Sequence, residues 1–189
     1  MSEVKSLEKI KKFWPENAPD INFVSKYVSK YKDELIVIKY GGNVLIDREV
    51  FNNFIEDIFI LNMLGLSVVV VHGGGPRIEK ELNKEKIETK FLNGLRVTDK
   101  KVIKIVENVL VDLNNDIVNS LNKRGSKAVS INSKINNIIQ VVPDRKELGF
   151  VGVPDKINID IIKDIINKNQ IPVVAPLGID ASNLTYNIN

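Results

Sequence analysis

The stretch 67–76 constrains the fold of this chain most strongly, because an apolar run there leads directly into three glycines and a proline. Four consecutive valines, at 68–71, are typical of a strand covered on both faces, as in a parallel sheet flanked by helices. Glycine lets ligand atoms approach bare backbone N–H groups, and Pro76 suits the first turn of a helix. The stretch therefore predicts an anion site of backbone donors at a helix N-terminus. A plain strand-to-helix turn, the alternative, needs only one glycine.

Composition excludes several classes of protein. The chain contains no cysteine, which rules out disulfides, thiolate metal sites and cysteine nucleophiles, and which fits a cytoplasmic location. Its formal net charge of +3 is small and its charges are interspersed, so no basic stripe for nucleic acid is evident. No run approaches the roughly 20 apolar residues of a membrane span. We therefore expect a cytoplasmic protein with neither nucleic-acid nor membrane partners.

Apolar periodicity divides most of the chain into alternating strands and helices. Strands are predicted at 35–39, 67–71, 127–131 and 171–175, with one more beginning at 184. Helices are predicted at 47–64, 77–84 and 159–169, and a fourth, capped by Thr98 or Asp99, is predicted to run to about residue 123. The apolar face of this fourth helix is predicted to contain Val102, Val106, Val109, Leu113, Ile117 and Leu121. This alternation predicts an α/β fold, a three-layer αβα sandwich with a mostly parallel open sheet.

Three segments depart from the alternation. Residues 133–154 are expected to contain a hairpin of two short strands, at 138–142 and 149–153, and residues 91–99 are expected to form a loop. Residues 1–34 are expected to form a helical extension, in which Phe23, Tyr27 and Tyr31 share one face. That apolar face packs either on its own domain or on another subunit.

The chemistry is expected at the carboxyl ends of the strands, where parallel sheets bind ligands. The loops 39–43 and 72–75 lie at such ends, and Lys39 with bare N–H groups can neutralise charge on a transferring phosphoryl group. Neither loop is a Walker A motif or a G-x-G-x-x-G dinucleotide fingerprint. Arg96 could hold a carboxylate bidentately, although each of these charges taken alone is more often solvated. His72, the only histidine, is expected to be a hydrogen-bonded structural residue.

Five motifs carry a resemblance to a known family. They are Lys-Tyr-Gly-Gly-Asn at 39–43, His-Gly-Gly-Gly-Pro at 72–76, Asn-Gly-Leu-Arg-Val-Thr at 93–98, Glu-Leu-Gly-Phe-Val-Gly at 147–152 and Tyr-Asn-Ile-Asn at 186–189. In this order they resemble the N-acetylglutamate kinases of the amino-acid kinase family, from about residue 35 to the end of the chain. The third and fifth motifs point to this branch, because other members share the lysine and the glycine loops.

The resemblance implies an amino-acid kinase fold and phosphorylation of the side-chain carboxylate of N-acetyl-L-glutamate by ATP with Mg²⁺, in arginine biosynthesis. It assigns catalytic roles to Lys39, Gly41 and Gly42, and substrate-binding roles to Gly74, Gly75, Arg96 and Asn187. By this match the lysine stabilises the transition state and the glycines cradle the acceptor carboxylate and the phosphoryl group. The arginine and the asparagine hold the amino-acid end of the substrate. No residue is assigned to a metal.

The resemblance also bears on domains and assembly. Family members continue beyond the last motif with an aspartate and a nucleotide-binding domain, so we expect 35–189 to be a substrate-binding domain that is inactive alone. The ATP site is then mostly outside this chain. The resemblance implies a homo-oligomer, either a dimer or, through the N-terminal helix, a hexamer. Asp112 stands where the family usually has glycine.

Several alternatives remain open at this stage. Carbamate kinase, aspartate kinase, glutamate 5-kinase and an aminoadipate-type carboxylate kinase share the fold. Aminoadipate differs from glutamate by one methylene, whereas a carboxylate held by Arg96 and Asn187 counts against carbamate. A non-catalytic acetylglutamate-binding or oligomerisation module is the alternative from a different functional class.

Overall fold

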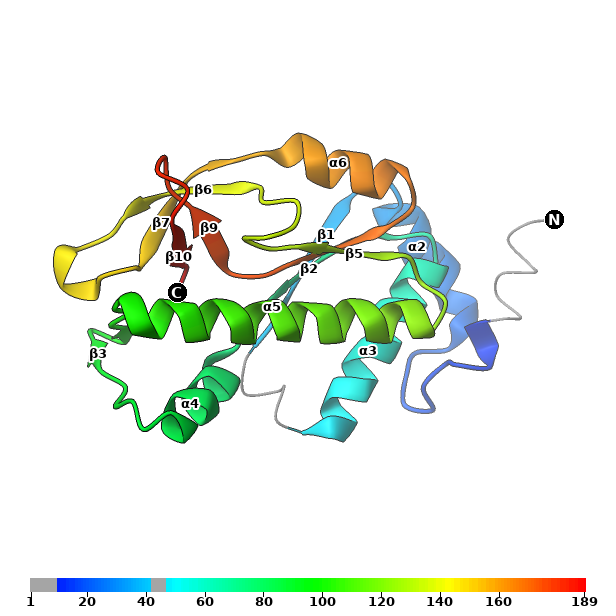
Figure 1. Cartoon of the computed structure of the whole chain (residues 1–189). Helices are drawn as coiled ribbons and strands as arrows, with labels where there is room; N and C mark the ends of the chain where they lie inside the picture. The colour runs from blue at the N-terminus through cyan, green and yellow to red at the C-terminus, as the bar shows by residue number, and fades with distance from the viewer. Residues whose placement is uncertain (1–9, 42–46) are drawn as a thin grey trace.

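A computed structural model describes residues 10–41 and 47–189, so that the expected site residue Gly42 lies outside the described residues. The centre of the molecule is a four-stranded sheet in the order β1-β2-β8-β5 (Figure 1). Its strands are β1 (Leu35–Tyr40), β2 (Ser67–His72), β5 (Ala128–Ile131) and β8 (Ile171–Val174). All three pairings are parallel, which confirms the prediction that these four strands are parallel neighbours in one sheet.

Strand β2 is covered on both faces, as its valines predicted. Val68 and Val70 belong to the hydrophobic cluster on one face of the sheet, and Val69 belongs to the cluster on the other. Successive side chains of a strand point to opposite faces, so an unbroken apolar run is the pattern that a doubly buried strand requires.

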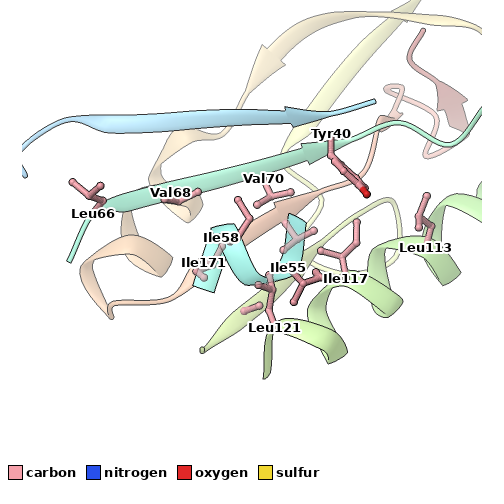
Figure 2. Packing of buried hydrophobic residues seen from close by; sticks show 12 residues of the cluster. Tyr40, Ile55, Ile58, Leu66, Val68, Val70, Leu113, Ile117, Leu121 and Ile171 are labelled. Carbon is pink, nitrogen blue, oxygen red and sulfur yellow. The ribbon is translucent and has the colours of Figure 1, made fainter. Parts of the chain in front are cut away.

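Two helices cover the first face of the sheet, α3 (Arg48–Met63) and α5 (Lys100–Lys123). Figure 2 shows their side chains gathered against those of β2, among them Ile55 and Ile58 of α3 and Ile117 of α5. Both helices begin at an aspartate whose carboxylate accepts backbone N–H bonds, Asp47 before α3 and Asp99 before α5. Residue 98 or 99 was expected to cap α5, and the structure selects Asp99.

The opposite face is covered by α6 (Ile159–Asn167) and by a second sheet in the order β10-β9-β6-β7. The strands of this second sheet are β6 (Ile139–Pro143), β7 (Gly152–Ile157), β9 (Leu177–Ile179) and β10 (Thr185–Asn187). Helices and the second sheet thus enclose the parallel sheet, which gives the predicted α/β sandwich. The antiparallel β6–β7 pair confirms the expected hairpin.

Two expectations about local structure are wrong in detail. The strand expected at 149–153 begins only at Gly152, because a 3-10 turn, η3 (Lys146–Leu148), precedes it and Gly149 has a φ of 67°. The loop expected at 91–99 contains a two-stranded hairpin, β3 (Phe91–Leu92) and β4 (Leu95–Arg96). Asn93 and Gly94 form its turn with φ values of 52° and 81°, the left-handed conformation that a two-residue hairpin requires.

The segment before β1 contains a short 3-10 helix, η1 (Ile21–Phe23), followed by α2 (Val24–Tyr31). Phe23, Tyr27 and Tyr31 are 64%, 59% and 40% exposed, so their common face is only partly covered by the rest of the chain. Val28, the residue after Tyr27 in α2, packs against the core beneath the parallel sheet. Whether the exposed face binds another subunit stays a prediction, and so does the division of the chain at residue 34.

The core predicts how two isoleucines in helices respond to truncation. Ile117 of α5 is fully buried in the cluster beneath β2, whereas Ile159 of α6 is 52% exposed. We expect Ile117→Ala to lower the free energy of unfolding by about 2–5 kcal/mol, because a cavity adds to the lost burial. Ile159→Ala, the matched control, should cost less than about 1 kcal/mol. Urea denaturation of both variants measures the difference, and equal midpoints would contradict the assigned core.

Candidate functional site

An open cleft of about 790 Å³ lies at the carboxyl ends of β1 and β2 and at the start of α4 (Gly75–Lys84). The site residues that were predicted from the sequence and that line it are Lys39, Gly41, Gly74, Gly75, Arg96 and Asn187. The structure therefore brings together every predicted site residue that it describes. Asp112 does not line this cleft; it lies with Arg77 and Lys80 along a separate groove between α4 and α5.

Pairing of β1 with β2 brings Lys39 beside the glycine loop. In the parallel register Lys39 lies opposite Val71 and Tyr40 lies opposite His72. The Gly73 N–H then donates to the Tyr40 carbonyl oxygen at 2.9 Å, so that the loop is tied to the end of β1. For residues 39–41 and 72–75, which the structure describes, this confirms the expectation that the two loops meet at one edge of the sheet.

The glycine loop presents backbone donors to the cleft at the start of α4. Gly74 is the N-cap residue, Gly75 is the first helical residue, and Pro76 follows in the first turn. Neither the Gly74 nor the Gly75 N–H is hydrogen-bonded to another described residue. Unpaired N–H groups at a helix N-terminus attract anions.

The two glycines tolerate a side chain to different extents. A Cβ atom on Gly74 would lie 2.5 Å from Cδ2 of Leu110 on α5, so packing disfavours a side chain there. A Cβ atom on Gly75 would meet no atom within 4 Å. The absence of a side chain at Gly75 therefore serves access to the backbone rather than packing.

Arg96 is 6% exposed, so the alternative of a solvated charge is wrong for this residue. Its Nη1 atom lies 3.0 Å from Oε2 of Glu79 on α4, and its guanidinium carbon lies 4.8 Å from the ring centroid of Phe91. Glu79 is not among the residues that line the cleft. The ion pair and the ring hold the guanidinium from two sides and leave further N–H donors for a carboxylate in the cleft.

The segment around Gly149 joins Arg96 to Asn187. The Thr98 N–H donates to Leu148 O at 2.9 Å, the Phe150 N–H donates to Thr98 O at 2.7 Å, and the Asn187 N–H donates to Phe150 O at 3.0 Å. Gly149 has a φ of 67°, and a Cβ atom there would lie 2.4 Å from the Thr98 carbonyl oxygen. Only glycine fits where these two segments of the chain cross. The crossing positions Arg96 and Asn187, the two residues expected to hold the amino-acid end of the substrate.

Asn187 is buried at the end of β10 and lines the same cleft as Arg96. Its Nδ2 atom donates to Oδ1 of Asn189 at 3.0 Å. An asparagine and an arginine that face one cleft can supply N–H donors to a carboxylate and an acceptor to an amide N–H. This pairing suits the amino-acid end of an N-acylated amino acid.

His72 is 1% exposed and is hydrogen-bonded on both ring nitrogens. Nδ1 lies 2.9 Å from the Gly73 carbonyl oxygen and Nε2 lies 3.1 Å from Nδ2 of Asn114. Burial, reinforced by the charge of Arg77, lowers the pKa of His72 to about 4, although the bond to Gly73 acts in the opposite direction. The expectation of a hydrogen-bonded structural histidine agrees with these contacts.

Sequence reasoning missed Glu79 and Asn114. Glu79 is a helix-surface carboxylate that pairs with Arg96 from a distant segment. No local pattern in the sequence indicates such a pairing, so Glu79 could not have been found. Asn114 did have a signal in the sequence, because it is a polar residue that interrupts the apolar face of α5 between Leu113 and Ile117, both fully buried. The same face was expected to include Val109, which is half-buried, whereas Leu110 is fully buried.

Two further features of the described residues bear on function. In residues 10–41 and 47–189, no three His, Asp or Glu side chains gather where they could hold a metal ion. Within the same ranges, every helix is too short or too polar to cross a membrane.

Comparison with known proteins identifies the relatives of the chain. The family described as "Amino acid kinase family" matches residues 34–189. The chain is 51% identical over 175 residues to the acetylglutamate kinase of Pelagibacter ubique (strain HTCC1062), with 93% of this chain and 61% of that protein covered. It is 42% identical over 165 residues to the acetylglutamate kinase of Campylobacter fetus subsp. fetus (strain 82-40), with 86% and 59% covered. The chain thus spans about three fifths of the length of these relatives.

Solved structures support the fold. The N-acetylglutamate synthase of Neisseria gonorrhoeae, complexed with coenzyme A and N-acetyl-glutamate, matches with a TM-score of 0.76 at 20% identity, over 89% of this chain and 39% of that one. The carbamate kinase of Giardia lamblia, bound to AMP-PNP, matches with a TM-score of 0.53 at 13% identity, over 81% and 61%. At these identities the likeness establishes the architecture and not the chemistry.

The burial of His72 predicts a pH dependence of stability. Its pKa is about 4 in the folded protein and 6.5 in the unfolded chain, so the unfolded chain binds more protons between these values. The contribution of His72 to the free energy of unfolding is therefore fully present above pH 6.5. This contribution falls as the pH is lowered through the window, by about 2 kcal/mol between pH 7 and pH 5. Urea denaturation at pH 7, 6 and 5 measures this slope. His72→Gln should have a shallower slope, and an unchanged slope would exclude His72 as its source.

Proposed function

The chain belongs to the amino acid kinase family, and from its cleft we propose that it forms the N-acetyl-L-glutamate-binding part of an acetylglutamate kinase. One observation carries this proposal: Lys39 and the glycine loop share a single cleft with Arg96 and Asn187. The cleft thus has one end suited to a phosphoryl group and another suited to an amino-acid carboxylate. The names of its relatives support the same choice.

The proposed reaction transfers a phosphoryl group to a carboxylate. A side-chain carboxylate oxygen of N-acetyl-L-glutamate attacks the γ-phosphorus of ATP, the bond from that phosphorus to the β–γ bridging oxygen breaks, and an acyl phosphate and ADP are formed. Little covalent chemistry is left to the protein, so positioning and charge neutralisation supply most of the catalysis.

The residues of this chain divide these tasks between the two ends of the cleft. The Lys39 ammonium and the N–H groups of Gly41, Gly74 and Gly75 would bind the reacting carboxylate and the oxygens of the transferring phosphoryl group. Gly42, outside the described residues, is assigned the same role by motif. Arg96 and Asn187 would hold the other end of the substrate, so that the side-chain carboxylate faces Lys39.

ATP with Mg²⁺ is the phosphoryl donor in this proposal. Mg²⁺ commonly binds through substrate phosphates and a small number of carboxylates, where it neutralises charge on the phosphates. The donors described in this cleft are N–H groups and a lysine, which suit the phosphate oxygens rather than the ion. Most of the nucleotide site would then lie outside residues 1–189.

Domain organisation, location and assembly complete the proposal. Residues 35–189 would form the substrate-binding domain of a cytoplasmic enzyme, and residues 1–34 would form a helical extension. The exposed face of Phe23, Tyr27 and Tyr31 supports self-association of this extension into a homo-oligomer.

Binding of N-acetyl-L-glutamate tests the proposal directly. We expect isothermal titration calorimetry to detect weak binding to the 1–189 chain, without ATP turnover. Arg96→Ala should weaken binding roughly ten- to a hundred-fold, because it removes charged hydrogen bonds worth about 1.5–3 kcal/mol. Arg124→Ala, which breaks an ion pair with Glu56 outside the cleft, is the matched control. Tighter binding of N-acetyl-L-2-aminoadipate than of N-acetyl-L-glutamate would instead favour the aminoadipate-type kinase.

Steady-state kinetics separate the two ends of the cleft in a complete kinase of which this chain forms a part. Lys39→Ala should chiefly lower kcat, because its charge meets charge that develops in the transition state. Arg96→Ala should chiefly raise KM for N-acetyl-L-glutamate, because the carboxylate that it binds stays equally charged throughout the reaction. The acyl phosphate can be trapped with hydroxylamine to follow the rate. A collapse of kcat in Arg96→Ala at unchanged KM would reverse this division of roles.

A further inference from the structure

The glycine loop contains three consecutive peptide groups, and each is held by a different part of the molecule. The first, between His72 and Gly73, is fixed by the Gly73 N–H bond to Tyr40 O of β1. The third, which begins at the Gly74 carbonyl, is fixed because that carbonyl accepts the Ile78 N–H in the first turn of α4, at 3.0 Å. Among the described residues, the contact that holds the middle peptide, between Gly73 and Gly74, is the one from the His72 ring to Gly73 O.

This middle peptide is the one that most needs an anchor. It joins two glycines, whose backbone dihedrals are the least restricted of any residue, so its plane can turn at little steric cost. A trans peptide is planar, with its carbonyl and its N–H pointing in opposite directions, and no cis peptide bond occurs among the described residues. Because the Gly73 carbonyl points to the buried ring of His72, the Gly74 N–H points away from it.

Asn114 determines which nitrogen of His72 carries the proton. The Nδ2 atom of Asn114 lies 2.9 Å from the Val173 carbonyl oxygen, which can only accept, so this end of the amide is the donor. The other end accepts from the Ser130 hydroxyl. The Nε2 atom of His72, which faces the amide nitrogen, must therefore be the acceptor, and the proton of the neutral ring lies on Nδ1, where it can bond to Gly73 O.

From this geometry we propose that His72 is a positioning residue, whose Nδ1–H holds the Gly73 carbonyl inward and thereby aims the Gly74 N–H at the anion in the cleft. Asn114 acts one step further back, because it keeps the proton of His72 on Nδ1. This inference rests on the proposed function for the identity of the anion, a carboxylate or a phosphoryl group. The orientation of the peptide rests on contacts within the chain alone.

Two substitutions at His72 separate positioning from mere packing. The side-chain amide nitrogen of asparagine is as many bonds from the backbone as Nδ1 of histidine, and that of glutamine is as many as Nε2. His72→Asn can therefore still donate to Gly73 O, whereas His72→Gln retains a polar group toward Asn114 and loses the bond to Gly73. Both variants lose the ring, so packing alone predicts similar effects.

The probe is inorganic phosphate, titrated into the ¹⁵N-labelled 1–189 chain while the amide signals of Gly74 and Gly75 are followed by NMR. We expect phosphate to shift both signals in the wild-type chain and in His72→Asn, with similar affinities. In His72→Gln the Gly74 response should be lost and the affinity should fall about tenfold, the effect of removing one hydrogen bond to a charged group. The Gly75 response should persist, because the first turn of α4 holds that peptide.

A second measurement needs no variant and decides the matter if the variants do not fold. The ¹⁵N shifts of the His72 ring in the wild-type chain report which nitrogen is protonated. Protonation on Nε2, an unresponsive Gly74 amide in wild type, or equal phosphate affinities in folded His72→Asn and His72→Gln would each overturn the inference. Failure of N-acetyl-L-glutamate to bind while phosphate behaves as expected would count against the proposed function alone.

Discussion

The structure depends on the burial of β2 on both of its faces. Val68 and Val70 are buried in the hydrophobic cluster on one face of the sheet, and Val69 is buried in the cluster on the other. The strand lies inside the sheet, between β1 and β8. Its carboxyl end is therefore flanked by the ends of other parallel strands, and the glycine loop that follows opens where a ligand can reach it. Lys39 is brought to the loop by the β1–β2 register.

A line of buried and half-buried polar groups crosses the same end of the sheet. His72 of β2, Asn114 of α5 and Ser130 of β5 are joined by hydrogen bonds, and Asn132 donates to the Ser130 hydroxyl at 2.9 Å. Buried polar groups destabilise a fold unless every donor and acceptor has a partner. Here backbone groups terminate the line at both ends, with Gly73 O accepting from the His72 ring and the Lys134 N–H donating to Asn132. Val173 O also accepts from Asn114, within the line. Such a line specifies the relative placement of α5 and the sheet in a way that an apolar contact would not.

The sequence was informative where a local pattern carried the signal. The parallel strands follow from apolar runs, and the cleft follows from the rule that ligands bind at their carboxyl ends. Strand β9 was missed because a strand of three residues is too short to show a periodicity. The start of β7 was misplaced because Gly149 is constrained by Thr98, which is distant in the sequence. The β3–β4 hairpin was missed although Asn93-Gly94 is a strong turn signal. Glu79 beside Arg96 arises from tertiary contact alone, which no local pattern encodes.

The two ends of the cleft belong to different layers of the molecule, and in the proposed function this bears on the length of the substrate. Lys39 and Gly74 are carried by the parallel sheet, whereas Asn187 is carried by the second sheet and Arg96 by the hairpin tied to it through Gly149. The chain passes between the two sheets at Ala175 and Leu177, both buried. A hydrophobic pocket discriminates one methylene by only about 1–3 kcal/mol. Two charged ends held at a fixed separation can discriminate more strongly, because a substrate that is too long leaves the buried Arg96 or a loop N–H without its partner. If the proposed substrate binds here, discrimination between N-acetylated dicarboxylates would depend on the junction between the two sheets as much as on the residues that line the cleft.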